Sequence, residues 1–342
     1  MASLLDTPAA REWVEAARRR HSQGVFGQIV SAVIWSDVRG ADGELLVPVD
    51  PVALARKIND SPHILLHGHD PGRPKGQVLE AALFETASGE QFVAAILGYY
   101  AEGDVLDFSK LDVDPAESVP PPARLPVLPE GGWIQVATDP REVDTAWLAS
   151  ISQDAPLPIR QTDLSHNAAD ATHELIRIGL IYLAVVWAPF ITSIASEAGK
   201  DTYAGIHKWV RKLLGRLSDR DNPVLDIHTH QDGCQVSFLF RGKDVKVHYA
   251  AHDLLPAAAA QAAALIAKLK HRGLPPRQLV YEFNSGASIW YPSYVVLHDN
   301  RIITDNTALI AIEQLPTSLS IGLSRVDVLT PVVRSIAEET EE

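Results

Sequence analysis

The chain has 342 residues, of which 46% are hydrophobic and 21% are charged, and it carries a formal net charge of -13 at neutral pH. This length is sufficient for two or three domains with cores of their own, and the composition excludes an intrinsically disordered chain. The acidic balance argues against nucleic acid as a partner, because its phosphate backbone would be repelled.

The N-terminal segment 1–111 has the pattern of a β-rich unit. Thr7 and Pro8 are typical of a helix start, so a helix is expected over 9–21. Alternating and β-branched residues then predict strands at 26–38, 45–49, 63–69, 77–84 and 91–98, with a short helix over 51–59.

The expected strand 63–69 is rich in histidine. Strand side chains alternate between two faces, so His63, His67 and His69 share one face, and Ile64 and Leu66 point to the other. Imidazoles at a strand end can transfer protons near neutral pH. His67 and His69 are therefore candidate catalytic residues.

A wider pattern surrounds this strand. His69 and Asp70 are followed by the turn Pro74-Lys75-Gly76 and by a hairpin. Over about residues 61–110 this arrangement resembles the histidine region of the tailed-phage prohead (capsid maturation) serine proteases. The resemblance implies that His69 is the general base and that a downstream serine is the nucleophile, for which Ser109 lies at a matching distance.

The serine context differs from that of the family. There the nucleophile stands in Ser-Ile-Gly or Ser-Val-Gly, whereas Ser109 is followed by Lys110 and lacks a glycine that lets the backbone approach a substrate carbonyl. A serine run with a glycine, Ser318 to Gly322, lies in another predicted unit. We therefore interpret the chain as a catalytically degenerate, protease-like scaffold or interaction module. An active serine peptidase that uses His69 is the alternative.

Two segments in the middle of the chain differ in composition and predicted structure. Segment 112–132 is rich in proline and acidic residues, which predicts an extended interdomain linker. Segment 133–222 is expected to be mostly helical, beginning with a strand over 133–137 and a helix over 139–150 that Asp139 and Pro140 cap.

Two apolar helices are expected within this region. The uncharged segment 178–195 is at the lower length limit for a membrane-spanning helix, and the next helix, 200–220, has an apolar stripe opposite basic residues. One interpretation is a core helix with an amphipathic neighbour, in a protein that self-associates or binds a protein partner. The other is a membrane-associating effector that uses helices 178–217 at an anionic surface. We favour the core interpretation.

The segment 223–330 is expected to be an α+β module followed by an acidic tail, 331–342. Strands are predicted at 224–230, 235–241 and 245–250 as a meander, then a helix over 257–270 that Asp253 caps, and then strands at 279–283, 293–297 and 301–304.

Polar side chains alternate along the first of these strands and its turn, at His228, His230, Asp232 and Cys234. Two imidazoles two residues apart on a strand can chelate a transition metal, so His228 and His230 are weak candidate ligands. We favour a polar face of hydrogen-bonded histidines instead, and expect no metal.

The whole chain is predicted to belong to the α+β class. It has no glycine-rich phosphate loop, so no cofactor is expected. Its single cysteine excludes an intramolecular disulfide framework, and the start of the chain has no basic segment followed by an apolar run, so we expect a cytoplasmic protein.

Overall fold

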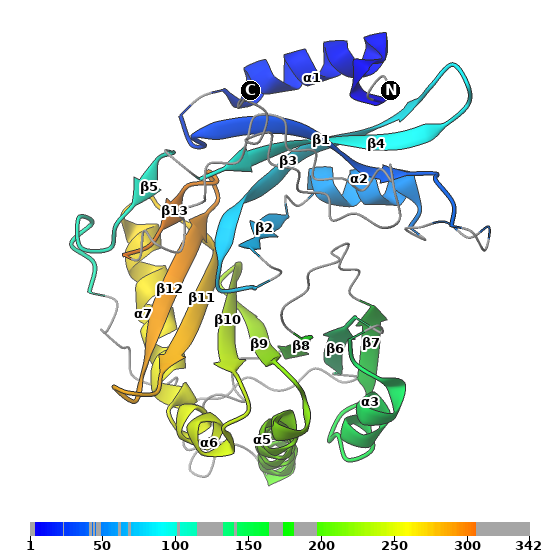
Figure 1. Cartoon of the computed structure of the whole chain (residues 1–342). Coiled ribbons are helices and arrows are strands. Elements are labelled where there is room, and N and C mark those ends of the chain that lie inside the picture. The colour runs from blue at the N-terminus through cyan, green and yellow to red at the C-terminus, as the bar shows by residue number, and fades with distance from the viewer. Residues whose placement is uncertain are drawn as a thin grey trace, which may run out of the picture.

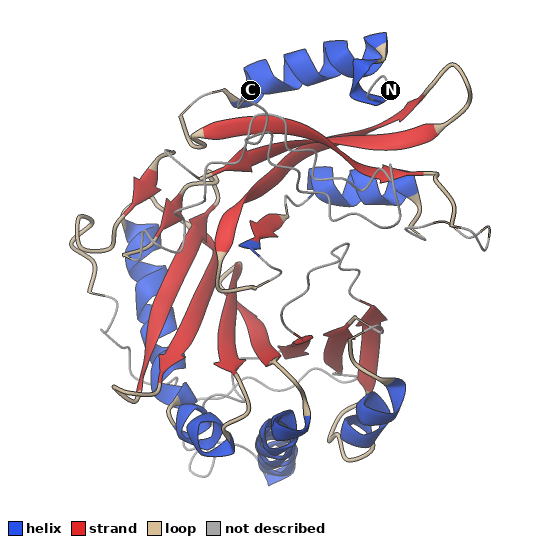
Figure 2. Cartoon of the chain, in the orientation of Figure 1, coloured by secondary structure: helices blue, strands red, loops and turns tan. Residues whose placement is uncertain are grey.

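The computed structural model describes residues 4–22, 24–40, 43, 45, 49–60, 63–67, 70–100, 103–114, 133–139, 142–163, 174–180 and 197–305. Within these residues the chain folds into two β-sheets with helices packed on them, which confirms the α+β class (Figure 2). The expected acidic tail, the run 318–322 and most of the expected linker, 115–132, lie outside the described residues.

The first sheet is antiparallel, has four strands and is built from the N-terminal residues. Its order is β1-β4-β3-β2, with bounds Gln28–Ser36 for β1, Ile64–Leu66 for β2, Pro74–Glu85 for β3 and Gln91–Tyr99 for β4. A short 3-10 turn, η1 (Leu4–Asp6), precedes helix α1 (Pro8–His21), and helix α2 (Pro51–Asp60) precedes β2. The two α-helices cover opposite faces of this sheet, because Val14 and Ala17 of α1 pack on Ile96, whereas Ile58 of α2 packs on Val93.

The second sheet has nine strands in the order β5-β13-β12-β11-β10-β9-β8-β6-β7. Its strands are β5 (Val105–Leu106), β6 (Ile134–Thr138), β7 (Ile159–Asp163), β8 (Glu174–Leu180), β9 (Pro223–Gln231), β10 (Cys234–Arg241), β11 (Pro276–Asn284), β12 (Ile289–Leu297) and β13 (Ile302–Ile303). The sheet is mixed: β13 pairs in parallel with β5, β11 with β10, β9 with β8 and β7 with β6.

Helices cover one face of the large sheet, which we call the outer face (Figure 1). They are α3 (Thr145–Ser152), α5 (Glu197–Arg216, continued by the 3-10 turn η4, Leu217–Asp219), α6 (Val245–Asp253) and α7 (Leu255–His271). Alternate strand residues such as Ile227, Val236 and Phe238 point to this face, and they pack with Leu214 of α5 and Leu265 of α7 in one continuous core.

The opposite, inner face of the large sheet meets the N-terminal sheet (Figure 1). Leu239, Val280 and Tyr294 on this face pack against Tyr100 and Ile64 from the N-terminal sheet and its flanks. Towards β8 and β9 the same face becomes polar, with Arg177, Asp226 and Ser237. The N-terminal sheet therefore sits on the apolar half of the inner face, beside a polar half.

One predicted strand is wrong. Residues 245–250 were expected to be the third strand of a meander, but they form helix α6. The Asp244 side chain accepts hydrogen bonds from the N–H groups of Lys246 and Val247, which caps a helix start. The buried residues His248, Ala251 and His252 then follow helical spacing, not the two-residue period of a strand.

The expected helix 178–195 is wrong at its beginning, because residues 178–180 end strand β8. The remainder, 181–195, lies outside the described residues. The other expected apolar helix exists as α5, and its stripe of Ile206, Val210 and Leu213 is buried in the core. Among the described residues, no single helix is long and apolar enough to cross a membrane; the bent pair α6 and α7 passes that test by length and composition only.

Other predicted boundaries move. Leu45 makes an isolated bridge with Arg39, and residues 46–48 of the expected strand lie outside the described residues. The N-cap residue of α3 is Asp144, not Asp139. Helix α7 begins at Leu255, after Leu254 instead of Asp253. Strands from the predicted units 133–222 and 223–330 share the large sheet, since β8 pairs with β9, and β5 joins the same sheet from segment 1–111.

Candidate functional site

Ser109, the expected nucleophile, lies in an exposed turn after β5. Its hydroxyl donates a short hydrogen bond to Asp107, the same carboxylate that accepts the Ser109 backbone N–H at 2.8 Å. This bond from the hydroxyl lowers the pKa of Asp107. A carboxylate with a lowered pKa is a poor proton acceptor at neutral pH.

The histidines of the predicted site are placed differently. His63 and His67 are exposed at the two ends of β2, which is restricted to Ile64–Leu66, and His69 lies outside the described residues. The backbone of His67 is fixed by the loop that follows: its N–H donates to the carbonyl of Arg73, and its carbonyl accepts the N–H of Asp70. The described contacts of Ser109 include no histidine.

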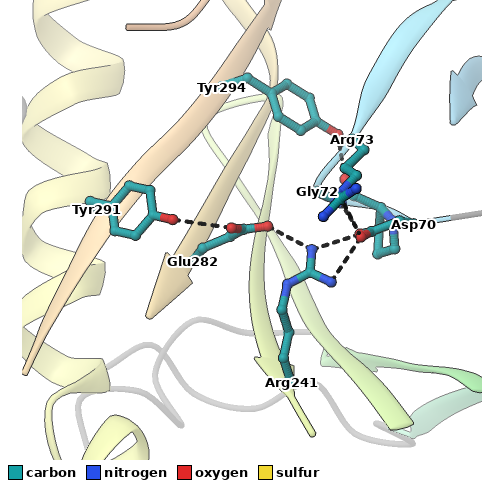
Figure 3. Close-up of polar contacts among 8 residues, drawn as sticks. Asp70, Gly72, Arg73, Arg241, Glu282, Tyr291 and Tyr294 are labelled. Carbon is teal, nitrogen blue, oxygen red and sulfur yellow. Dashed lines mark hydrogen bonds and ion pairs between the residues drawn. The ribbon is translucent and has the colours of Figure 1, made fainter. Parts of the chain in front are cut away.

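Asp70, the residue after the expected base, instead joins the two sheets. The residue is 2% exposed, and Arg241 of β10 donates to both of its carboxylate oxygens, at 2.9 and 2.6 Å. Arg241 also donates to Glu282 of β11 at 2.6 Å, as Figure 3 shows. Burial alone would lower the pKa of Arg241, but its bonds to Asp70 and the charge of Glu282 raise it. We call Asp70, Arg241 and Glu282 the inter-sheet clasp.

The loop beside the clasp is adapted to it. The N–H of Gly72 donates to Asp70 at 2.9 Å, and the Tyr294 hydroxyl donates to the carbonyl of Pro71 at 2.8 Å (Figure 3). A side chain at Gly72 would collide with the carboxylate of Glu282 and the guanidinium of Arg241. Glycine therefore leaves room for Glu282 and Arg241 to keep their positions in the clasp.

A second junction between the sheets is centred on Gln77 of β3, which has no exposed surface. Its side-chain amide donates to the Tyr100 hydroxyl at 2.6 Å and to the Asn300 carbonyl at 3.1 Å. Its carbonyl oxygen accepts from Arg277 at 3.1 Å. Because a buried amide with its partners in place orients its neighbours, this junction fixes Arg277.

A cavity of about 240 Å³ lies between the two junctions and beside the polar half of the inner face. The N-terminal unit contributes His63, Ile64, Leu66 and Pro71 to its lining, and the large sheet contributes Leu175, Arg177, Asp226, Gln235, Ser237, Arg277, Gln278, Val280 and Tyr294. Pockets for drug-sized ligands typically have about 300–1,000 Å³, so this one suits a smaller molecule. Neither Ser109 nor His67 is among the described lining residues.

One wall of the cavity carries a buried ion pair. Arg177 of β8 and Asp226 of β9 are opposite each other in the parallel ladder, and the Arg177 Nε donates to the Asp226 Oδ2 at 2.9 Å. Asp226 is 1% exposed, and its Oδ1 has no hydrogen-bond partner among the described residues. A buried acceptor without a donor is unfavourable, so this oxygen is a point where a bound molecule could add a hydrogen bond.

Arg277 is the second cation of the lining. Its two hydrogen-bond partners, Gln77 and Asn300, are neutral amides, and no carboxylate among the described residues pairs with it. Burial lowers the pKa of Arg277. The pKa of His63 is also lowered: although part of its side chain is exposed, the part that lines the cavity loses hydration, and the positive charges of Lys57 and Arg177 act in the same direction. His63 is therefore neutral at pH 7, in a cavity whose charge is positive.

The histidines of the large sheet are not gathered into a metal site. Among the described residues, no group of three or more His, Cys, Asp or Glu side chains is placed to hold a metal ion. His228 lies on the inner face, where burial lowers its pKa, and His230 is exposed. Cys234 points to the outer face, and burial raises the pKa of its thiol to about 12, which keeps it protonated.

The cavity was not predicted from the sequence. A usable signal was present, because Arg177 stands between Ile176 and Ile178 and Asp226 stands between Leu225 and Ile227, and charges among such apolar neighbours are almost never buried unless paired. The predicted helix after Arg177 concealed this pattern.

Comparisons with protein-family models, with curated proteins and with solved structures found no match to this chain.

Proposed function

We propose that this chain is a noncatalytic recognition module, in which the protease-like N-terminal unit and the large sheet together frame a binding cavity. The observation that carries this proposal is the separation of the two features. The partly open polar site lies between the sheets, whereas the Ser109 hydroxyl is bonded to Asp107 in an exposed turn.

The inter-sheet contacts support the same function. A binding site requires side chains that are held in place before the ligand arrives. The Pro71 carbonyl in the loop beside the clasp fixes Tyr294, and the Gln77 junction fixes Arg277; these two side chains line the cavity from β12 and β11. Peptide hydrolysis would instead require a base within hydrogen-bond reach of the Ser109 hydroxyl and donors for the oxyanion.

The test is intact-mass analysis after treatment with a fluorophosphonate, which labels activated serines covalently. We expect no labelled serine in the wild-type protein, while a known serine hydrolase in the same reaction is labelled. The proposal would be overturned if Ser109 acquired the label and either His69→Ala or His67→Ala abolished it. Ser109→Ala is the control that identifies the labelled position.

A further inference from the structure

We propose that the inter-sheet cavity binds a small organic acid, a monocarboxylate that also carries a hydroxyl or amine. This inference rests on the proposed function, because it names the ligand class of the same cavity. It is argued from three properties of the lining: its net charge, the unpaired guanidinium and the free carboxylate oxygen.

The net charge favours a monoanion. Arg177 and Arg277 contribute two positive charges and Asp226 contributes one negative charge, which leaves one positive charge among these three side chains. A buried or half-buried charge without a counter-ion is unfavourable, so an anion of single charge would stabilise the lining. A doubly charged anion would leave one negative charge unbalanced.

The unpaired cation is suited to a carboxylate. Arg277 uses its two terminal nitrogens on Gln77 and Asn300, at 3.1 and 3.4 Å, and these neutral partners hold the guanidinium plane. Guanidinium groups keep further N–H donors and match the planar carboxylate better than an ammonium does. The fixed orientation of Arg277 reduces the entropy that a ligand would otherwise lose.

Arg277 is a donor that requires an acceptor on the ligand, whereas Asp226 requires a donor. Arg177 satisfies its Oδ2, and its Oδ1 lacks a donor among the described residues. A hydroxyl or amine on the ligand would supply that donor. The ligand therefore has an acidic end for Arg277 and a donor for Asp226, with a size limited by about 240 Å³.

The test is isothermal titration calorimetry of the full chain with four probes. Glycerate has both groups, propionate lacks the hydroxyls, glycerol lacks the carboxylate, and inorganic phosphate has a higher charge. We expect saturable binding of glycerate, weaker binding of propionate and none of glycerol. A wild-type protein that does not bind glycerate, or binds glycerol or phosphate as tightly, would overturn the assignment.

Three variants locate the site. Arg277→Gln should reduce the affinity for glycerate by at least about tenfold, because a charged hydrogen bond is lost. Arg277→Lys retains the charge and should keep part of that affinity, which guards against a variant that merely fails to fold. Lys246→Gln, which removes one positive charge from an exposed position of α6, should bind like wild type. Equal affinity in Arg277→Gln and Lys246→Gln would contradict the proposal.

The two proposals fail separately. Labelling of Ser109 would overturn the noncatalytic function and leave the glycerate titration unaffected. Absence of glycerate binding with an unlabelled serine would overturn only the ligand class.

Discussion

At the scale of single residues, the clasp shows how a sequence neighbour of an expected catalytic histidine can have a structural role. Asp70 is buried and receives two hydrogen bonds from Arg241, so its charge is needed to balance a guanidinium that is itself half-buried. Removing the Asp70 charge takes two charge-assisted hydrogen bonds from Arg241 and leaves it with Glu282 as its carboxylate partner in the clasp, which is less favourable than losing an exposed ion pair.

We therefore expect Asp70→Asn to lower the free energy of unfolding by about 3 kcal/mol. The matched control is Asp299→Asn, because Asp299 pairs with Arg301 at 2.7 Å and is half exposed, and its loss should change stability by less than about 1 kcal/mol. Urea unfolding at pH 7 measures both values. Equal effects would show that the clasp is no stronger than a surface pair.

A second single residue, His252, makes a pH-dependent contribution to the free energy of unfolding. Its side chain is 3% exposed and its ring lies 4.4 Å from that of His207. Burial, followed by the positive charge of protonated His207, lowers the pKa of His252 from 6.5 to about 4, with Arg211 acting in the same direction and Asp253 opposing it.

Between pH 6.5 and about 4, the unfolded chain therefore binds a proton at His252 that the folded chain does not, and stability falls as the pH falls through this window. The loss should approach roughly 3 kcal/mol. We expect His252→Gln to flatten the dependence of unfolding free energy on pH between 6.5 and 4.5, as measured by urea titration. Parallel curves for the two proteins would contradict the shift.

At the scale of elements, local sequence patterns were sufficient to predict a helix or strand wherever the element that it pairs with or packs on is adjacent in sequence. The hairpin of β3 and β4, the helix α1 and the pair β9 and β10 were predicted close to their observed bounds, because alternation, turn residues and helix-start residues act within a few positions. The parallel pairs β5 with β13 and β8 with β9 were not, since nothing local specifies a partner so distant in the chain. The cavity depends on these distant pairs and could not be derived.

The helix α6 was missed although its signal is local. Residues 245–250 were predicted to be a strand, but the preceding Asp244 is an N-cap that accepts bonds from the N–H groups of Lys246 and Val247 at 2.9 and 3.3 Å. We expect Asp244→Ala to lower the free energy of unfolding by about 1 kcal/mol. Thr7→Ala at the start of α1 is the comparison, because Thr7 makes no capping bond with its side chain. Thermal unfolding measures both variants. If Asp244→Ala lost no more stability than Thr7→Ala, the capping role of Asp244 would be contradicted.

The amphipathic helix α5 offers a test of whether its apolar stripe belongs to the core. Leu214 has no exposed surface and lies in the same cluster as Phe240 and Leu265. Leu214→Ala should lower the free energy of unfolding by about 2–5 kcal/mol, because a cavity remains where the side chain packed. Lys208→Ala, on the exposed face, should have an effect within about 0.5 kcal/mol. Equal stability of both variants in denaturant titration would remove the stripe from the core.

At the scale of the whole molecule, the two sheets are joined by apolar and polar contacts together. Tyr100 and Ile64 from the N-terminal unit are packed in one cluster with Leu239, Val280 and Tyr294, and the clasp and the Gln77 junction lie on its flanks. The apolar contacts supply a driving force without direction, whereas the hydrogen bonds specify how the sheets are oriented. A cavity with charged walls can persist between them because the contacts around it hold the sheets at a fixed separation.

These contacts predict that the two sheets unfold as one unit. Native-state hydrogen exchange at increasing urea, read by mass spectrometry, should give the same opening free energy for peptides from 74–99 and from 223–284, because separating the sheets would expose the cluster around Tyr100 and break both hydrogen bonds between Arg241 and Asp70. Peptides from the exposed turn 285–288 should exchange early in every condition, which calibrates the measurement. In Asp70→Asn both sheets should lose protection equally. If peptides from 74–99 alone exchanged earlier, in the wild type or in Asp70→Asn, the N-terminal sheet would open independently. The two sheets around the cavity would then not unfold as one cooperative unit.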